Sequence, residues 1–465
     1  MALTISVEDI ISTTNNPLLQ AKSHWTRVRL GDVATVLNGY AFKAELFNRN
    51  EGTPLIRIRD VGSKDSQTLY SGEFESKYLV QPGELLIGMD GDFNCARWRG
   101  KPSLLNQRVC KVSMSTDAYE DRFLDFVLPG YLKAINDATS SITVKHLSSS
   151  TIQDIPLPCP PIDEQREIVA ELEKQFSRLD EAVANLQRVK ANLKRYKASV
   201  LKDAVEGRLA PTEAELARRE GRSFETGEQL LQRILETRRV EWKGRGAFPE
   251  SLDATVGTAD LSAGWVWTTL GQCFRVAVGA TPSRKEHSYW GGDIPWVSSG
   301  EVQLGRIRHT DEHISAAGLA NSSTQLNPVG SVMIGMIGQG KTRGQAAILD
   351  IEAANNQNCA AIWVSRTAIP TEYVFFWLMS RYTETRREGS GNNQQALNKR
   401  LIEQIPLPLP PLAEQQRIVA EVDRRLSLVS NVEEEVHANL KRAQALKQAT
   451  LAKAFDGSAK GVSND

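Results

Sequence analysis

The chain has 465 residues, of which 41% are hydrophobic and 24% charged, and its 56 basic side chains are balanced by 56 acidic ones. This length predicts several domains of about 100–200 residues. No apolar run approaches the about 20 residues of a membrane span, and Met1–Gln20 carries Glu8 and Asp9 where a signal peptide has a basic region. We therefore expect a cytoplasmic protein that does not contact a membrane. The zero net charge argues against a generally basic nucleic-acid surface, which leaves local basic loops or a partner that contacts phosphates.

Cysteine usage argues against a structural zinc site and a disulfide framework. The five cysteines are scattered without a Cys-x-x-Cys pair, and only six histidines accompany them. We expect buried small side chains at Cys95, Cys110, Cys159, Cys273 and Cys359.

The first part of the chain predicts a mixed, strand-rich domain. Short apolar runs bounded by Gly, Pro, Asn and Asp are typical of strands, as at Pro54–Ile58 and Glu84–Ile87. A helix is expected over Arg122–Ile135, and a polar loop, Ser140–Ser150, follows it.

A proline-rich segment, Ile155–Pro161, comes next and cannot be helical, because prolines lack an N–H and hold the preceding residues extended. We predict a hinge here, with Asp163 as the N-cap of a following helix and Arg166 in place of the preferred Glu three residues on. Gly207 is expected to end that helix. Its apolar residues recur at three- and four-residue steps, as in a coiled coil, at Ile162, Val169, Leu172, Phe176, Leu179, Val183, Leu186, Leu193 and Val200.

The second part of the chain repeats this order. The charged segment Glu213–Glu241 predicts an extra helix before the second strand-rich domain. In that domain we expect a strand at Ser331–Ile334, a helix over Glu372–Tyr382 and a polar loop at Gly389–Gln395. A second proline-rich hinge, Ile405–Pro411, follows.

A second long helix then extends to Gly457. Its apolar seam comprises Leu412, Val419, Val422, Leu426, Val429, Val436, Leu440 and Ala443. Lys190 and Lys197 interrupt the first seam, and Glu433 and Lys447 the second. Buried charges of this kind cost stability but can fix the register.

An internal repeat determines the predicted architecture. Ile155 begins the block IPLPCPPIDEQREIVAE, and 250 residues later Ile405 begins IPLPLPPLAEQQRIVAE. Asn106-Gln107 and Asn356-Gln357 are also 250 residues apart. We therefore divide the chain into an N-terminal segment (1–24), a first strand-rich domain (25–155), a hinge and helix (156–208), a linker (209–261), a second strand-rich domain (262–405), a second hinge and helix (406–457) and a tail (458–465).

This repeat predicts an α+β fold in which the two long helices pair with each other. One chain carries both, so we expect an antiparallel coiled coil with pseudo-twofold symmetry and one strand-rich domain at each end. A helix of about 45 residues is about 67 Å long, which matches about 20 base pairs of DNA. Two DNA-reading domains on such a pair would contact inverted half-sites about one helical turn apart. An oligomerisation coiled coil is the alternative, and the duplicated domains argue against it.

This layout resembles the DNA specificity (S) subunit of type I restriction-modification systems, the HsdS family. The resemblance rests on the two Pro-Leu-Pro-x-Pro-Pro-x-x-Glu-Gln-x-x-Ile-Val-Ala-Glu blocks and their helices, and it extends from about Trp25 to Gly457. It implies two target-recognition domains, each of which reads half of a bipartite double-stranded DNA site. It also implies that the helix pair docks methyltransferase (M) subunits, two per chain, and that restriction (R) subunits can join. The chain would then have no catalytic residues and no cofactor or metal of its own, and S-adenosylmethionine, ATP and Mg would bind to the partner subunits.

A phosphate-binding pattern leaves a second hypothesis open. Gly335–Thr342, GMIGQGKT, fits GxxxxGK[ST], which in a P-loop cradles phosphates at the start of a helix. Here Ala346–Ile351 predicts a strand where that helix would stand, and the corresponding first-half loop, Gly88–Asn94, lacks the pattern. A P-loop ATPase with a coiled-coil arm and a coiled-coil scaffold without an enzyme activity remain the alternatives.

Candidate DNA-reading residues are basic, amide or hydroxyl side chains in or beside predicted loops, because Arg and Lys donate to guanine and Asn and Gln bond adenine. In the first domain they are Tyr40, Lys43, Arg57, Arg59, Arg97, Arg99, Gln107 and Arg108. In the second they are Ser298, Ser299, Arg306, Arg308, Gln339, Lys341, Arg343 and Gln357. The matched Asn-Gln pairs are equally compatible with a shared scaffold, since recognition residues should differ between the two halves.

Overall fold

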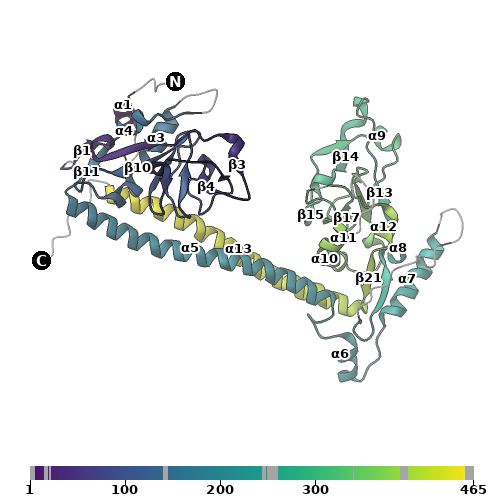
Figure 1. The fold of residues 1–465 in the computed structure, drawn as a ribbon. Helices are drawn as coiled ribbons and strands as arrows, with labels where there is room; N and C mark the ends of the chain where they lie inside the picture. The colour runs from purple at the N-terminus through teal and green to yellow at the C-terminus, as the bar shows by residue number, and fades with distance from the viewer. Residues whose placement is uncertain are drawn as a thin grey trace. The chain divides into compact units, whose positions relative to one another are not determined.

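The computed structural model describes residues 6–14, 19, 22, 24–139, 145–242, 248, 260–338, 340–387 and 396–455. The chain forms two compact units. Unit 1 contains Met1–Gln187 with His437–Asp465, and unit 2 contains Arg188–Val436. Each unit therefore holds one part of each long helix, α5 (Ile162–Val205) and α13 (Leu412–Phe455) (Figure 1).

Unit 1 is built on a sheet in the order β2-β10-β7-β8, beside a second sheet in the order β3-β5-β4-β9-β6. The strands are β2 (Ala34–Asn38), β3 (Phe47–Asn48), β4 (Thr53–Ile56), β5 (Leu69–Tyr70), β6 (Leu79–Val80), β7 (Leu85–Gly88), β8 (Cys95–Arg97), β9 (Ser103–Leu105) and β10 (Val109–Met114). The helices before α5 are α1 (Val7–Thr13), α2 (Leu30–Val33), α3 (Leu124–Ala138) and α4 (Ser149–Gln153). The predicted strands and the predicted helix of this domain are thus present, with ends shifted by one to three residues.

Unit 2 repeats the central sheet in the order β13-β20-β17-β18-β15, beside a sheet in the order β16-β14-β19. The strands are β13 (Val276–Val278), β14 (Trp290–Val297), β15 (Gly305–Ile307), β16 (Glu312–Ile314), β17 (Val332–Gly335), β18 (Ala346–Leu349), β19 (Ala354–Asn355) and β20 (Cys359–Ile362). The helices are α6 (Glu213–Glu220), α7 (Gly227–Glu241), α8 (Leu270–Cys273), α9 (Ala316–Ala320), α10 (Thr371–Ser380), α11 (Tyr382–Arg387) and α12 (Lys399–Glu403).

The proline-rich segments are strands rather than the predicted hinges. β11 (Pro156–Cys159) pairs antiparallel with β1 (Thr26–Arg29), and β21 (Pro406–Leu409) pairs in the same way with β12 (Val266–Thr269). The prolines alternate with other residues along each of these strands. The N–H groups that proline lacks would therefore all lie on one edge of the strand, and the opposite edge forms the hydrogen bonds to the neighbouring strand. Leu157, in β11, and Leu407, in β21, are fully buried.

The repeated Glu-Gln pair fastens each long helix to its domain. In unit 1, Trp25 Nε1 donates to Glu164 at 3.1 Å, and Gln165 Nε2 donates to the Pro160 carbonyl at 2.8 Å. In unit 2, Trp265 Nε1 donates to Glu414 at 2.9 Å, and Gln415 repeats the second bond on the Pro410 carbonyl at 2.8 Å. The strongest sequence repeat therefore encodes the junction between a domain and its helix.

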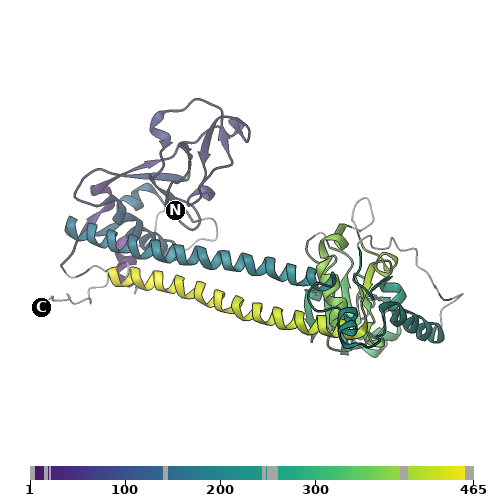
Figure 2. The same cartoon turned by 90° about the horizontal axis from the view of Figure 1, so that it is seen from below.

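Within each unit the two long helices pack antiparallel, as predicted (Figure 2). In unit 1, Lys447 near the end of α13 pairs with Asp180 at 3.2 Å and lies 4.7 Å from the Phe176 ring centroid, near the start of α5. In unit 2, Lys197 near the end of α5 pairs with Glu433 at 2.6 Å. Residue numbers thus rise along one helix while they fall along the other.

The seam is apolar where predicted, but its charged positions differ from the expectation of buried charges. Lys197 and Glu433 are about a third exposed, at 34% and 35%, and neutralise each other across the helices. Lys190 is exposed and lies off the packed face. These charges therefore keep contact with water and need not be desolvated.

Two further expectations about helix ends are wrong, and one is confirmed. α5 begins at Ile162, so Asp163 lies in its first turn and is not the N-cap. The segment Glu213–Glu241 forms two helices, because Gly221 ends α6 in a left-handed conformation and Thr226 caps α7. Gly207, just after α5, has φ +70°, as the predicted helix end requires. Gly457 lies outside the described residues.

Candidate nucleic-acid interface

The residues of unit 1 that gather at one end of its sheets surround the turn Asn106–Val109. Gly39 passes so close to this turn that a Cβ atom on it would lie 2.1 Å from the Asn106 carbonyl oxygen. The Gln107 N–H donates to the Tyr40 carbonyl at 2.8 Å, which sets Tyr40 beside Gln107. The Asn106 N–H donates to the Ile56 carbonyl at 3.4 Å, which brings the next residue, Arg57, to the same end.

The side chains at this end are exposed and include several of the predicted ones. Tyr40 is 49% exposed and its ring packs 5.2 Å from that of Tyr78. Lys43, Arg57 and Gln107 are also exposed. The structure therefore groups a tyrosine, an amide and basic side chains that the sequence separates by more than sixty residues.

Arg108 in the same turn belongs to a cluster that the sequence did not reveal. Its Nε lies 3.5 Å from Asp90 Oδ2, and His146 Nδ1 lies 2.6 Å from Asp90 Oδ1. Asp90 lies in the hairpin after β7, and His146 lies just before α4. Three separate loops thus meet around one carboxylate.

Arg59 lies in a polar hollow. It is 62% exposed, 3.9 Å from Asp60 and 3.4 Å from the Thr68 hydroxyl. Arg49 and Lys64 line the same hollow, and sequence reasoning missed both of them.

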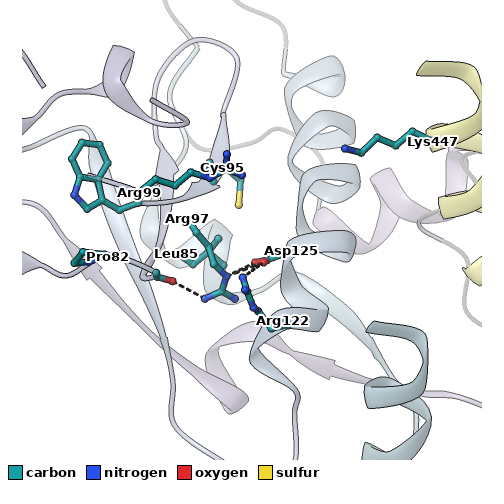
Figure 3. Close-up of a pocket in the computed structure, with 11 residues that line it drawn as sticks. Pro82, Leu85, Cys95, Arg97, Arg99, Arg122, Asp125 and Lys447 are labelled. Atoms are coloured by element: carbon teal, nitrogen blue, oxygen red, sulfur yellow. Dashed lines mark hydrogen bonds and ion pairs between the residues drawn. The ribbon is translucent and has the colours of Figure 1, made fainter. Parts of the chain in front are cut away.

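Arg97 and Arg99 lie at the other end of the central sheet. The β7–β8 register pairs Arg97 with Leu85, at the opposite end of β7 from Gly88. Arg97 is 12% exposed and pairs with Asp125 at 2.8 Å (Figure 3). It also pairs with Asp121 at 2.8 Å. Burial by itself would lower the pKa of the Arg97 guanidinium, but the two ion pairs outweigh burial and raise this pKa. Arg97 therefore stabilises the packing of β8 on α3, and Arg99 is exposed beside it.

Unit 2 builds the same scaffold around the turn Asn356–Cys359. Gly279 matches Gly39, since a Cβ atom on it would lie 1.9 Å from the Asn355 carbonyl oxygen. The Asn356 N–H donates to the Val297 carbonyl at 3.0 Å, so Ser298 occupies the position of Arg57. Gln357 is exposed, and its side chain accepts a hydrogen bond from the Thr281 hydroxyl at 2.6 Å.

The two scaffolds present different side chains at equivalent positions. The Met89 N–H donates to the Arg108 carbonyl at 2.8 Å, and the Met336 N–H donates to the Asn358 carbonyl at 2.8 Å. The Leu147 N–H donates to Met89, and the Leu397 N–H to Met336. Unit 1 therefore carries Tyr40, Arg57, Asp90, Arg108 and His146 where unit 2 carries Ala280, Ser298, Ile337, Asn358 and Ala396.

The remaining candidates of unit 2 are dispersed. Ser298 and Ser299 are half-buried beside the turn. Arg306, on the edge strand β15, pairs with Asp350 at 2.8 Å and with Glu372 at 2.6 Å, and Arg308 pairs with Asp350 at 3.3 Å. These ion pairs fasten β15 to the neighbouring elements.

The hairpin after β17 holds three candidates with different environments. Lys341 is exposed, Arg343 is buried at 9% exposure, and Gln339 lies outside the described residues. Burial makes Arg343 unsuited to direct contact with DNA.

The phosphate-binding pattern falls in this hairpin and not before a helix. β17 and β18 pair antiparallel, as the predicted strand at Ala346 requires. The Gly335 N–H donates to the Gln345 carbonyl at 2.9 Å, and the Gly344 N–H donates to the Gly335 carbonyl at 2.8 Å. These amides close the hairpin and do not point to a common anion, so the geometry disfavours the ATPase hypothesis.

One exposed arginine of unit 2, Arg284, was missed by sequence reasoning. Arg284 pairs with Glu312 through both of its terminal nitrogens and lies 3.6 Å from the Trp290 ring centroid. The ion pair holds the pKa of Glu312 below its usual value. This arginine is 53% exposed, and only the fold brings it to Glu312.

No metal site or membrane span is found in the described part of the chain. Its histidine, cysteine, aspartate and glutamate side chains form no group of three or more that could hold a metal ion. No helix among the described residues is both long and apolar enough to cross a membrane. The five cysteines form no disulfide, and Cys110, Cys273 and Cys359 are buried. Burial raises the pKa of each of these three thiols to about 12.

Comparison with known proteins identifies the family. The family model described as "Type I restriction modification DNA specificity domain" matches residues 22–194 and 263–441. The specificity subunit of the type I restriction enzyme EcoBI of Escherichia coli is 32% identical over 461 residues, which cover 98% of this chain and 91% of that protein. The specificity subunit of EcoR124I/EcoR124II of Escherichia coli is 26% identical over 172 residues, 36% of this chain and 42% of that protein.

A solved structure, from work on complex assembly and conformational transition of the type I R-M system, shares the fold. It has a TM-score of 0.60 and 20% identical residues, and the match covers 94% of this chain and 99% of that one. Together with the repeated domain–helix junctions, the match to the family model in both halves shows that this chain belongs to the specificity subunits of type I restriction-modification systems, the non-catalytic subunits that recognise DNA.

Proposed function

We propose that this chain reads a bipartite double-stranded DNA target, one half-site with each unit. The observation that carries this proposal is the pair of corresponding turns, Asn106–Val109 and Asn356–Cys359, which corresponding backbone hydrogen bonds anchor to the neighbouring loops while the side chains around them differ. A shared backbone fixes how each domain approaches a groove, and different side chains there read different bases. Different side chains at corresponding positions are what two different half-sites require.

The DNA-reading set that we propose is narrower than the set predicted from sequence. In unit 1 it comprises Tyr40, Lys43, Arg57, Gln107 and Arg108, with Arg59 at its edge. In unit 2 it comprises Ser298, Ser299, Gln357 and Lys341. Arg97, Arg306 and Arg343 are left out, because ion pairs or burial hold them in the fold.

The chain would dock methyltransferase (M) subunits, one for each unit, and restriction (R) subunits would join them. Apolar side chains on the long helices that lie outside the seam support a docking role. In unit 2, Tyr196 and Leu428 are 44% and 54% exposed, and in unit 1 Leu446 is 53% exposed. Exposed apolar groups of this kind are typical of interfaces with another protein. S-adenosylmethionine, ATP and Mg would be bound by those partners.

The neutral net charge is consistent with DNA contacts that are shared between this chain and its partner subunits. The chain carries 56 basic and 56 acidic side chains, so phosphate contacts from its own surface are local. Partner subunits that surround the DNA would supply the remaining contacts and most of the salt dependence of binding.

Selection from random duplexes tests the proposal. The chain is co-expressed with its M partner, and the duplexes that the complex retains or methylates are sequenced. The expected result is two short specific blocks around a gap of fixed length. Replacement of residues 25–155 by the same domain of another family member should change one block alone. Binding without sequence preference would contradict the proposal and favour a coiled-coil scaffold.

A further inference from the structure

The turn that carries Arg108 is shaped for glycine, yet it holds an arginine. The Val109 N–H donates to the Asn106 carbonyl at 3.2 Å, which closes a four-residue turn. Arg108, the third residue of this turn, has φ +73°. Turns with a positive φ at this position favour Gly or Asn, because a Cβ atom is strained there. A strained residue that persists at an exposed turn points to a functional role for its side chain.

Stability alone does not account for Arg108. Its side chain is 55% exposed, and its ion pair with Asp90 is long, at 3.5 Å. Exposed ion pairs contribute little to the free energy of folding, and the strain of the turn opposes that gain. Glycine at this position would remove the strain at the cost of a weak contact.

Asp90 and His146 flank the guanidinium on one side. Asp90 accepts from His146 Nδ1 at 2.6 Å with one oxygen and faces Arg108 Nε with the other. Because His146 Nδ1 donates to Asp90, it cannot also accept a hydrogen bond from Arg108 Nη1, which lies 3.3 Å away. No side-chain or carbonyl oxygen among the described residues accepts from the outer edge of this guanidinium, formed by Nη1 and Nη2.

The carboxylate that orients Arg108 is itself rigidly placed. The Gly91 N–H donates to the Lys145 carbonyl at 3.0 Å, and the Leu147 N–H donates to the Met89 carbonyl at 2.7 Å. Lys145 Nζ in turn donates to Asn136 Oδ1, at the end of α3, at 3.1 Å. The hairpin of Asp90 and the segment of His146 are thus tied to each other and to a helix. Such support is what a side chain needs to discriminate between bases.

Given the proposed function, we propose that Arg108, oriented by Asp90 and His146, reads a guanine in the half-site of unit 1. The outer edge of a guanidinium presents two parallel N–H groups that match guanine O6 and N7 in the major groove. Asp90 and His146 are positioning residues in this account. Unit 2 has Ile337, Asn358 and Ala396 at the three equivalent positions, so its half-site is read there by different chemistry.

The decisive substitution is Arg108→Gly in the complete complex with its M partner. Glycine suits the positive φ, so the variant is expected to fold with an unchanged or higher melting temperature. The guanine of one block should become degenerate while the other block stays the same. Affinity for the wild-type target should fall about tenfold to a hundredfold. Lys133→Gln, which removes one exposed positive charge from α3 (the side chain is 73% exposed), is the matched control and should change neither block.

A modified base separates base reading from phosphate contact. With 7-deazaguanine at the guanine position, the wild-type complex should lose affinity, because N7 is the acceptor that is removed. Arg108→Gly should bind both duplexes equally. Asp90→Asn should keep the motif but discriminate less between them, because the guanidinium is held less firmly.

Three outcomes would overturn the inference. If Arg108→Gly keeps the guanine in its motif, another residue reads that base. If affinity falls equally for every sequence while the motif stays unchanged, Arg108 contacts a phosphate. If the wild type binds 7-deazaguanine as well as guanine, N7 is not contacted. In each case a split wild-type motif would still support the proposed function, whereas absence of any split motif would refute that function itself.

Discussion

The junction between each domain and its long helix offers a prediction with an internal control. Trp265→Phe removes the indole N–H that donates to Glu414 at 2.9 Å, and Trp25→Phe removes the equivalent donor to Glu164 at 3.1 Å. Both tryptophans are buried, at 9% and 7% exposure, so both substitutions leave a similar void. The two carboxylates differ in environment, since Glu414 is fully buried and the Glu164 side chain is 27% exposed.

The environment of the carboxylate sets the expected magnitudes. Glu414 would keep a hydrogen bond from the Glu213 N–H at 2.9 Å but would lose a donor that water cannot replace. A hydrogen bond to a buried charged group contributes about 1.5–3 kcal/mol. Glu164 keeps Lys22 at 3.2 Å and gains water, so its loss is about 0.5–1.5 kcal/mol. Trp265→Phe should therefore lower the free energy of unfolding by about 1–2 kcal/mol more than Trp25→Phe.

Calorimetry and hydrogen exchange together measure this difference. In units of this size each kcal/mol shifts the melting temperature by about 2–4 °C. Hydrogen exchange at the first turn of α13 should accelerate in Trp265→Phe, and at the first turn of α5 in Trp25→Phe. Equal losses in the two variants would refute the reasoning, because they would mean that the void and not the buried carboxylate determines the cost.

Four other predictions concern the titration of the same two carboxylates, one core residue, one exposed residue of α13 and the hairpin after β17. Burial raises the pKa of Glu414, whereas for Glu164 burial is outweighed by the bonds from Lys22 and Trp25, which hold its pKa below the usual value. As the pH rises from 4.5, unit 2 should lose stability through Glu414, and as the pH falls below 4.5, unit 1 should lose stability through Glu164. Thermal unfolding measured between pH 3 and 7 tests both effects. Glu414→Gln should abolish the loss of stability above pH 4.5, and Glu164→Gln should abolish the loss of stability below pH 4.5. Profiles like that of the wild type in these two variants would contradict this prediction. Ile418→Ala, at a residue 1% exposed in the core of unit 2, should cost about 2–5 kcal/mol in urea unfolding. Leu428→Ala, at a residue 54% exposed, should cost under about 0.5 kcal/mol and weaken co-purification of the M partner, and a large loss of stability would mean that Leu428 packs in the core. The chain alone should show no ATP binding in a calorimetric titration, and Lys341→Ala should only lower DNA affinity and reduce the salt slope by about one; ATP binding that Lys341→Ala abolishes would restore the P-loop hypothesis.

Periodicity and the internal repeat predicted the architecture because each depends on short-range pattern. The seam residues from Val169 to Val200 are spaced for a helix pair whatever else the chain does, and the repeated block required two similar units. The same reasoning argued against a P-loop at GMIGQGKT, since Ala346–Leu349 is apolar in the manner of a strand.

Predictions from local sequence pattern were wrong where the structure depends on contacts with a distant segment of the chain. Ile155–Pro161 looked like a hinge because prolines exclude a helix, but whether an extended segment is free or paired depends on β1, which lies more than a hundred residues earlier. Arg97 and Arg343 looked like available donors, and their environment depends on Asp125 and on the hairpin that buries Arg343.

The sequence by itself determined the two strand-rich domains, the two long helices with their antiparallel pairing, and the family. Spacing along one chain is enough for these, because helix periodicity and repetition are visible without knowledge of distant contacts. Only the tertiary structure decided which side chains meet. Asp90, Arg108 and His146 come from three loops with no spacing rule between them, so their cluster, and the reading of a base that we assign to it, follows from how the sheets fold together.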